Sequence, residues 1–125
     1  MGLDIILGAD PSSTALIVID MQVDFLSPQG RLPIDRARID DLIAHVNAAI
    51  VLSQARGVLV VHAGNEFPRL SVANVFRKFA AIDPRVRREG TRYISKRHGD
   101  AFTNPELSAL LSRSAIQTVL ISGQQ

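Results

Sequence analysis

The sequence predicts an α/β protein in which helices cover both faces of a mainly parallel sheet. Three observations indicate this fold class. Apolar runs rich in β-branched residues recur along the chain, segments with helical spacing separate them, and the order strand, helix, strand repeats. Strands joined through helices pair in parallel, and a parallel sheet is buried on both faces. The expected architecture is therefore a three-layer sandwich.

The first half of the chain predicts a βαβ unit. Thr14 to Asp20 is a continuous apolar run, as expected for a strand buried on both faces. From about Asp35 to Arg56, apolar residues recur at three- and four-residue steps, which predicts a helix with Asp35 as its N-cap. Gly57 stands where a helix commonly ends, and Val58 to Val61 follows as a second buried strand. The crossover between these strands should be right-handed.

The second half adds two strands and up to two helices. Asn104 and Pro105 occupy the N-cap and first-turn positions of a helix that should end near Ser114. In chain order, the expected elements are a short helix within Ser71 to Ile82, a strand at Thr91 to Ser95, the helix from Asn104, and a strand at Ile116 to Ser122. The whole order predicts a Rossmann-like fold with four parallel strands.

Composition places the 125 residues in one globular domain, with 46% hydrophobic and 21% charged residues. The net charge of +2 is too small to predict binding to nucleic acid or to a membrane surface. The basic stretch from Arg85 to Arg97 is expected to be a solvated, ion-paired loop, because Tyr93 is its only aromatic residue. No apolar run reaches the roughly 18 residues of a membrane span. The first ten residues lack a secretory signal, so we expect a cytoplasmic protein.

Four residues stand where predicted strands end, the edge at which such sheets place their sites: Asp20, His62, Lys96 and Gly123. Asp20 can act there as a general acid or base, or it can cap the next turn, and the spacing alone leaves both open. Asp24 is assigned the structural role. Lys96 can hold a facing carboxylate ionised and polarise a substrate carbonyl, or it can be a solvated side chain.

His62 also has two interpretations. It can line the site, or it can be a buried side chain that packs and hydrogen-bonds. Metal-ligand spacing of the Asp-x-His or His-x-His type is absent around it, and a pair with Glu66 is the one metal alternative left open. The chain has no cysteine and no Gly-rich phosphate loop. We therefore predict no metal and no cofactor.

Three sequence blocks stand in an order that is more specific than any one of them alone. They are ALIVIDMQVDF at Ala15 to Phe25, ISKRHGDAFTNPELSALL at Ile94 to Leu111, and IQTVLISGQQ at Ile116 to Gln125. Together they resemble the isochorismatase-like cysteine hydrolases, which include isochorismatases, nicotinamidases and N-carbamoylsarcosine amidases. The blocks are similar to the opening signature of this superfamily, to its lysine motif with the following helix, and to the strand that leads to its glycine turn.

The resemblance implies a six-stranded parallel sheet, of which about four strands are present, and an Asp-Lys-Cys triad. Asp20 would be the aspartate and Lys96 the lysine, and both would help to form the thiolate that attacks the substrate. The substrate would be a small amide, a carbamoyl compound or isochorismate. The metal pattern of the nicotinamidases is not visible after the second strand, which disfavours a metal-dependent nicotinamidase.

The resemblance also assigns the surroundings of the triad. Phe25, Gln22 and His62 would line the substrate pocket. Gly123, Gln124 and Gln125 would begin the turn whose backbone N–H groups form the oxyanion hole. The triad cysteine of the family usually falls a few residues after this turn, and these 125 residues contain none.

Two hypotheses follow. In the first, the protein is a hydrolase of this superfamily whose chain continues beyond Gln125 to its cysteine. In the second, it is a catalytically inactive short member that acts as an oligomerising or binding module. The strand at Ile116 to Ser122 bears on both, because it lacks the charges and prolines that protect an edge and is expected to be an inner strand. We expect a homo-oligomer and a small-molecule substrate. A nucleic-acid partner is disfavoured.

Overall fold

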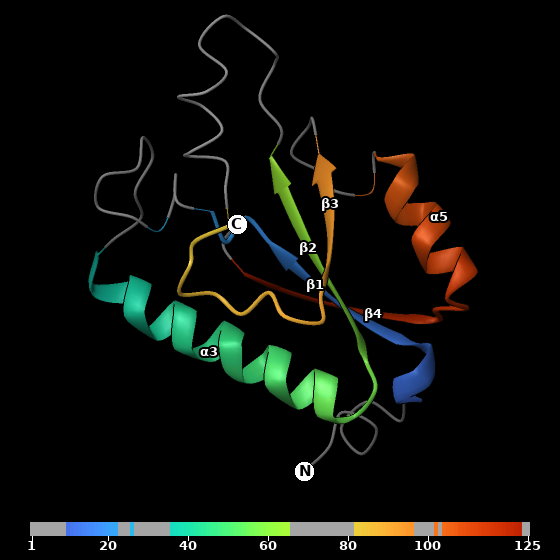
Figure 1. The fold of residues 1–125 in the computed structure, drawn as a ribbon, viewed down its shortest axis with the longest axis horizontal. Coiled ribbons are helices and arrows are strands. Elements are labelled where there is room, and N and C mark those ends of the chain that lie inside the picture. The colour runs from blue at the N-terminus through green and yellow to red at the C-terminus, as the bar shows by residue number, and fades with distance from the viewer. Residues whose placement is uncertain are drawn as a thin grey trace, which may run out of the picture.

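The computed structural model describes residues 10–22, 26, 36–65, 82–96, 102 and 104–123, with the side chains of residues 36, 37, 65 and 96 left undescribed. In chain order, the elements are η1 (Pro11–Ser13), β1 (Thr14–Ile19), α3 (Arg36–Ala55), β2 (Leu59–Asn65), β3 (Arg92–Lys96), α5 (Pro105–Arg113) and β4 (Thr118–Gly123) (Figure 1). The short helix expected within residues 71–82 lies outside the described residues, apart from Ile82. That residue forms an isolated antiparallel bridge with Gln22, so the helix does not extend to it.

The four described strands form one parallel sheet in the order β3-β2-β1-β4. In register, Ile17 of β1 stands opposite Val61 of β2 and Ile121 of β4. Because all strands are parallel, their carboxyl ends meet at one edge of the sheet (Figure 1). This confirms the predicted fold class, although β2 continues four residues beyond the expected Val61 and so includes His62.

Alternate strand residues pack against different helices, which creates the three layers. Leu16, Val18 and Val60 belong to the cluster beneath α3, whereas Ile17 and Val61 belong to the cluster beneath α5. Figure 1 shows the two helices with the strands between them. Each fully buried Val or Ile side chain contributes roughly 1.5 to 3 kcal/mol to folding. The continuous apolar run of β1 is therefore explained by burial on both faces.

The end of α3 follows the predicted glycine signal. Gly57 has a φ of 79°, in the left-handed region that glycine adopts at little cost. Its N–H donates to the carbonyl of Gln54 at 3.2 Å, and the N–H of Val58 donates to the carbonyl of Ser53 at 2.9 Å. These two bonds form a Schellman motif. The turn directs the chain from α3 straight into β2.

The start of α5 is capped as the sequence predicts. The side chain of Asn104 accepts a hydrogen bond from the N–H of Glu106 at 2.9 Å, and Pro105 occupies the first turn. The amide of Asn104 also donates to the carbonyl of Ser95 in β3. One side chain therefore joins the beginning of α5 to the carboxyl end of β3.

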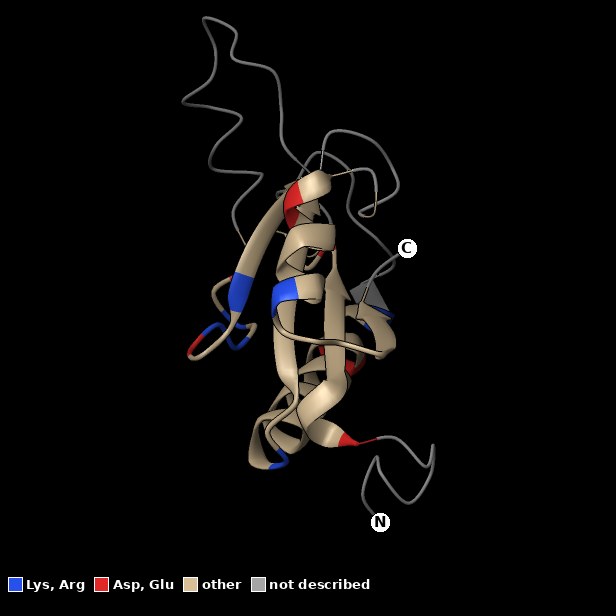
Figure 2. Cartoon of the chain, turned by 90° about the vertical axis from the view of Figure 1, so that its right-hand side faces the viewer, with Lys and Arg blue, Asp and Glu red and all other residues tan. Residues whose placement is uncertain are grey.

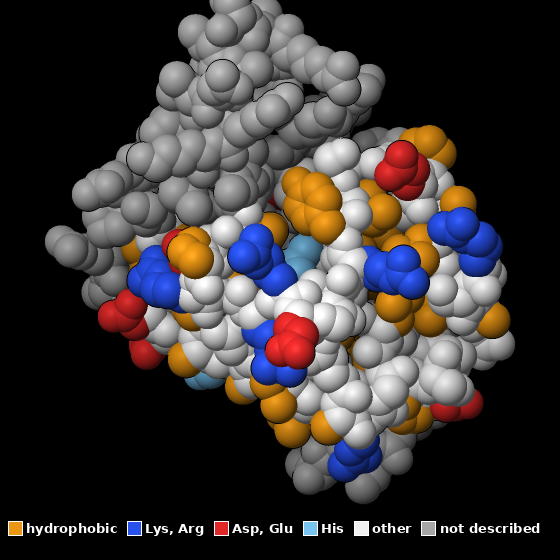
Figure 3. All heavy atoms as spheres, in the orientation of Figure 1, with side chains coloured by type: hydrophobic (Ala, Val, Ile, Leu, Met, Phe, Trp, Pro, Cys, Tyr) orange, Lys and Arg blue, Asp and Glu red, His pale blue; other side chains and the backbone are white. Residues whose placement is uncertain are grey.

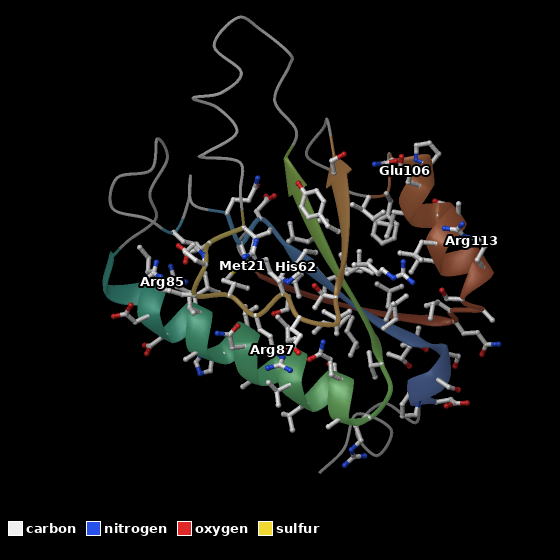
Figure 4. All side chains as sticks on the ribbon, viewed as in Figure 1. Met21, His62, Arg85, Arg87, Glu106 and Arg113 are labelled. Carbon is white, nitrogen blue, oxygen red and sulfur yellow. The ribbon has the colours of Figure 1, made fainter. Side chains whose placement is uncertain are left out.

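Residues 82–91 run beside α3, on the face of the sheet that this helix covers, and are tied to the helix by its amide side chains (Figure 4). Asn47 donates to the carbonyl of Arg85 and accepts from the N–H of Arg87, both at 2.8 Å. Gln54 accepts from Arg87 Nε at 2.9 Å and donates to the carbonyl of Glu89 at 2.7 Å. The segment expected to be a solvated basic loop is thus held by specific hydrogen bonds.

Charged residues are sparse on the strands. β1, β2 and β4 carry no Lys, Arg, Asp or Glu, whereas β3 has Arg92 and Lys96 at its two ends (Figure 2). On the face shown in Figure 3, the described basic and acidic side chains are interspersed, with no large patch of one sign. Within the described ranges, no helix is long and apolar enough to span a bilayer.

β4 is an edge strand among the described strands, with β1 as its one neighbour. Each of its six residues is at least partly exposed, and Ile121 is 52% exposed. The sequence predicted an inner strand at this position. Leu120 and Val119 pack against the two core clusters, so the apolar residue of β4 that burial within the described residues does not explain is Ile121.

Candidate active site at the carboxyl edge of the sheet

Three of the predicted site residues converge at the carboxyl edge of the sheet. Asp20 directly follows β1, Lys96 is the last residue of β3, and Gly123 is the last residue of β4. Because β2 separates β1 from β3, the strands that carry Asp20 and Lys96 lie two strand spacings apart, about 10 Å. The backbone of Lys96 pairs with that of Asn65.

Asp20 has a constrained backbone and a buried side chain. Its φ is 57°, its side chain is 8% exposed, and its N–H donates to the carbonyl of Ala63 at 2.9 Å. The left-handed region costs most residues about 1 to 2 kcal/mol, although Asp tolerates it better than they do. Strain of this kind persists where neighbouring structure enforces it, and it often accompanies function.

Gly123 packs directly against β1 beside Asp20. Its φ is 115°, and a Cβ at this position would lie 2.3 Å from the carbonyl oxygen of Ile19. Only glycine fits this contact. The predicted pocket residue Phe25 and the predicted turn residues Gln124 and Gln125 lie outside the described residues.

His62 lies inside β2, three residues before the end of the strand, and its side chain is 1% exposed. Its Nε2 is 2.9 Å from the carbonyl oxygen of Arg87. A carbonyl can only accept, so Nε2 carries the hydrogen and Nδ1 of the neutral ring bears the lone pair. Burial lowers the pKa of His62; the bond to Arg87 opposes this, and the nearby charge of Arg88 lowers the pKa further. The hydrogen-bonding role left open by the sequence is therefore present, and a role in lining the pocket stays a prediction.

The segment after β1 is fixed by Asp83 and Arg85, which sequence reasoning did not single out. The N–H of Asp83 donates to the carbonyl of Met21 at 2.9 Å. Arg85 forms two side-chain bonds of 3.0 Å with the carboxylate of Asp83 and also donates to the carbonyl of Leu26 at 3.1 Å (Figure 4). The only sequence signal was the turn at Asp83-Pro84, which gives no indication of the distant segment it contacts.

The carboxylate of Asp83 is stable in its ionised form. Burial raises its pKa, but hydrogen bonds from the side chain and N–H of Arg85, together with the charge of Arg85, outweigh this and lower the pKa below its ordinary value. The predicted pocket residue Gln22 pairs with Ile82, the residue before Asp83, and is fully buried. In the described part of the chain, no three His, Cys, Asp or Glu side chains gather as a metal site requires.

These features define an α/β protein with a candidate site at the carboxyl ends of its parallel strands. The isochorismatase domain model matches residues 14–125, and the chain belongs to the isochorismatase domain family. The family match therefore agrees with the resemblance that the three sequence blocks indicate. No curated protein matches the chain.

Solved structures share this fold. A cysteine hydrolase from Pseudomonas syringae pv. phaseolicola 1448A superposes with a TM-score of 0.80 at 17% identity, covering 94% of this chain and 62% of that one. An isochorismatase from Pseudomonas putida KT2440 gives 0.75 at 22% identity, covering 100% and 66%. A pyrazinamidase from Pyrococcus horikoshii, solved in complex with zinc, gives 0.72 at 26% identity, covering 90% and 71%. The chain thus spans about two thirds of the length of these proteins.

Proposed function

We propose that the protein is a cysteine hydrolase that cleaves a small amide, a carbamoyl compound or an isochorismate-type substrate. Asp20 and Lys96 are the residues of this chain that act in the reaction. The observation that carries the proposal is the position of Asp20, a buried carboxylate with a left-handed backbone at the edge where β3 presents Lys96. Family membership supports the reaction class.

The chemistry requires a thiol, and these 125 residues contain no cysteine. In this proposal, a cysteine encoded after Gln125 supplies it. Asp20 accepts the thiol proton, and the ammonium group of Lys96 stabilises the resulting negative charge. The thiolate adds to the carbonyl carbon of an amide, and the proton held by Asp20 passes to the nitrogen, so that ammonia leaves and a thioester remains. Water then hydrolyses the thioester to the free acid and the thiol.

Gly123 contributes the geometry of the turn in this proposal. Its φ of 115° and its contact with Ile19 place the end of β4 beside the residue that precedes Asp20. The backbone N–H groups that follow would then stabilise the oxyanion of the tetrahedral intermediate.

The test is the intact mass of the protein from its natural source, followed by a substrate screen. We expect a mass several kilodaltons above 13.6 kDa, a cysteine within the added residues, and ammonia release from at least one small amide or carbamoyl compound, or turnover of isochorismate. A mass of 13.6 kDa would contradict the proposal. So would a longer protein that lacks the cysteine and turns over none of these compounds.

The exposure of β4 favours a second candidate function, that of an inactive oligomerising module. An edge strand with unprotected N–H and C=O groups can pair with another chain, and Ile121 adds exposed apolar surface. This candidate predicts that the 125-residue chain forms a stable oligomer that buries β4. Light scattering after size-exclusion chromatography tests it, and a well-folded monomer would exclude it.

A further inference from the structure

Gly64 marks a point where side chains from two different segments meet over the end of β2. A Cβ at Gly64 would lie 2.9 Å from Tyr93 Oη and 3.2 and 3.3 Å from Cδ and Nε2 of Gln22. Tyr93 belongs to β3, where it pairs in register with His62, and its hydroxyl reaches position 64 farther along the sheet. Gln22 belongs to the segment after β1. The missing side chain of Gly64 makes room for both groups.

The two side chains differ in exposure. Gln22 is completely buried, whereas Tyr93 is 50% exposed. A polar amide is buried at a cost unless its surroundings fix and satisfy it, so the position of Gln22 is well determined. The half-exposed phenol places its hydroxyl at the same point. Both side chains therefore reach the same point of β2, Tyr93 from β3 and Gln22 from the chain that follows β1.

This junction lies two residues from Asp20. The backbone of Gln22 bridges to Ile82, and the carbonyl of Met21 accepts from the N–H of Asp83. On the other side, the N–H of Asp20 donates to Ala63 in β2. Asp20 therefore lies between two sets of backbone hydrogen bonds, one to β2 and one to residues 82 and 83. Its left-handed backbone conformation depends on both sets.

We propose that Gln22 and Tyr93, packed together over Gly64, form a positioning bridge that holds the Asp20 carboxylate in place at the carboxyl edge. This inference rests on the proposed function of Asp20 and adds to it the residues through which the neighbouring strand β3 controls its geometry. Neither Gln22 nor Tyr93 reacts in this proposal. Their effect on Asp20 is transmitted through packing over β2.

The test is the titration of the Asp20 carboxyl group by ¹³C NMR, assigned with Asp20→Asn. We expect Gln22→Leu and Tyr93→Phe each to move the Asp20 midpoint by about half a pH unit or more, because the local hydrogen bonding and burial change. The double variant should shift it little further than the larger single change, because both remove the same bridge. Gln117→Leu, at an exposed glutamine before β4, is the matched control and should leave the midpoint unchanged.

A second readout follows from the composition. Tyr93 is the only tyrosine, and the chain has no tryptophan, so fluorescence reports on this side chain directly. Gln22→Leu should change it, and Gln117→Leu should not. Tyr93→Phe loses only the hydroxyl. If this variant folds and the titration midpoint of the Asp20 carboxyl group is unchanged, the proposed bridge is wrong, even if Gln22→Leu fails to fold. Neither readout requires turnover, so an inactive protein that shows both shifts would reject the hydrolase and retain the bridge.

Discussion

Gly123 and Ile19 are in backbone contact where β4 and β1 end side by side. A Cβ at Gly123 would lie 2.3 Å from the carbonyl oxygen of Ile19 and 2.7 Å from its nitrogen. Asp20 directly follows Ile19, just beyond the end of β1. The glycine at the end of one strand therefore sets how closely that strand approaches the residue that precedes the candidate catalytic carboxylate.

Substituting Gly123 should be much more costly than substituting another glycine with positive φ. Gly123→Ala must relieve a clash with backbone as well as adopt a φ of 115°, so we expect a loss of about 2 to 4 kcal/mol. Gly57→Ala, where no atom lies within 4 Å of the added Cβ, should lose only about 1 kcal/mol. Urea unfolding measures both. Equal losses would show that the contact with Ile19 is unimportant.

Acid should weaken the fold through His62. Burial lowers its pKa below the ordinary 6.5, so the unfolded chain takes up a proton at a pH where the folded chain does not. The free energy of unfolding should therefore fall as the pH decreases below about 6.5. His62→Gln should flatten this slope between pH 7 and 5, measured by urea unfolding, and exposed His45→Gln serves as the control. A slope that survives His62→Gln would assign the effect elsewhere.

Asp83 should stabilise the protein at neutral pH and down to a more acidic pH than His62 does. Its pKa is lowered, so its contribution is present above its ordinary value of 3.8 and is lost as the pH falls through the folded value. At neutral pH, Asp83→Asn should cost about 1 to 2 kcal/mol through its weakened bonds to Arg85. Asp40→Asn is the matched control: its carboxylate lies 3.7 Å from the same guanidinium but is 91% exposed. Thermal unfolding that ranks the two variants equally would contradict the assignment.

Asn104 should matter for both the helix and the site. Asn104→Ala removes the cap of α5 and the bond to Ser95, which precedes Lys96, so we expect a loss of about 1 to 2 kcal/mol. Ser112→Ala, at an exposed position of α5, should have little effect. In the complete protein, Asn104→Ala should also reduce turnover. Wild-type stability of this variant would show that neither bond is important.

Local signals explain how much of the fold the sequence could predict. The 3.6-residue period of α3, the Schellman glycine at position 57 and the cap at Asn104 are all encoded within a few residues, and the structure confirms them. The parallel sheet followed from the alternation of strand and helix. Strand lengths were less accurate, because β2 continues through His62, Gly64 and Asn65, which are not typical strand residues.

The site was harder to predict, because its geometry depends on contacts between distant residues. The bond from His62 to the carbonyl of Arg87 spans 25 residues, and the one from Arg85 to the carbonyl of Leu26 spans 59. No local sequence pattern predicts either of these two hydrogen bonds. The left-handed backbone of Asp20 is equally hidden, since aspartate is compatible with it but does not require it. Sequence blocks could nominate Asp20 and Lys96, whereas only the structure brings Gln22 and Tyr93 together over Gly64.

The central claim is that Asp20 acts in catalysis, and the most direct measurement is kcat/KM of the complete protein and of Asp20→Asn on the best substrate from the screen. With melting temperatures matched, we predict that Asp20→Asn lowers kcat/KM about 10²- to 10⁴-fold, as expected for the loss of a group that transfers a proton. Asp41→Asn, at an exposed position of α3, should leave kcat/KM unchanged. Full activity of Asp20→Asn with an intact fold would contradict the claim.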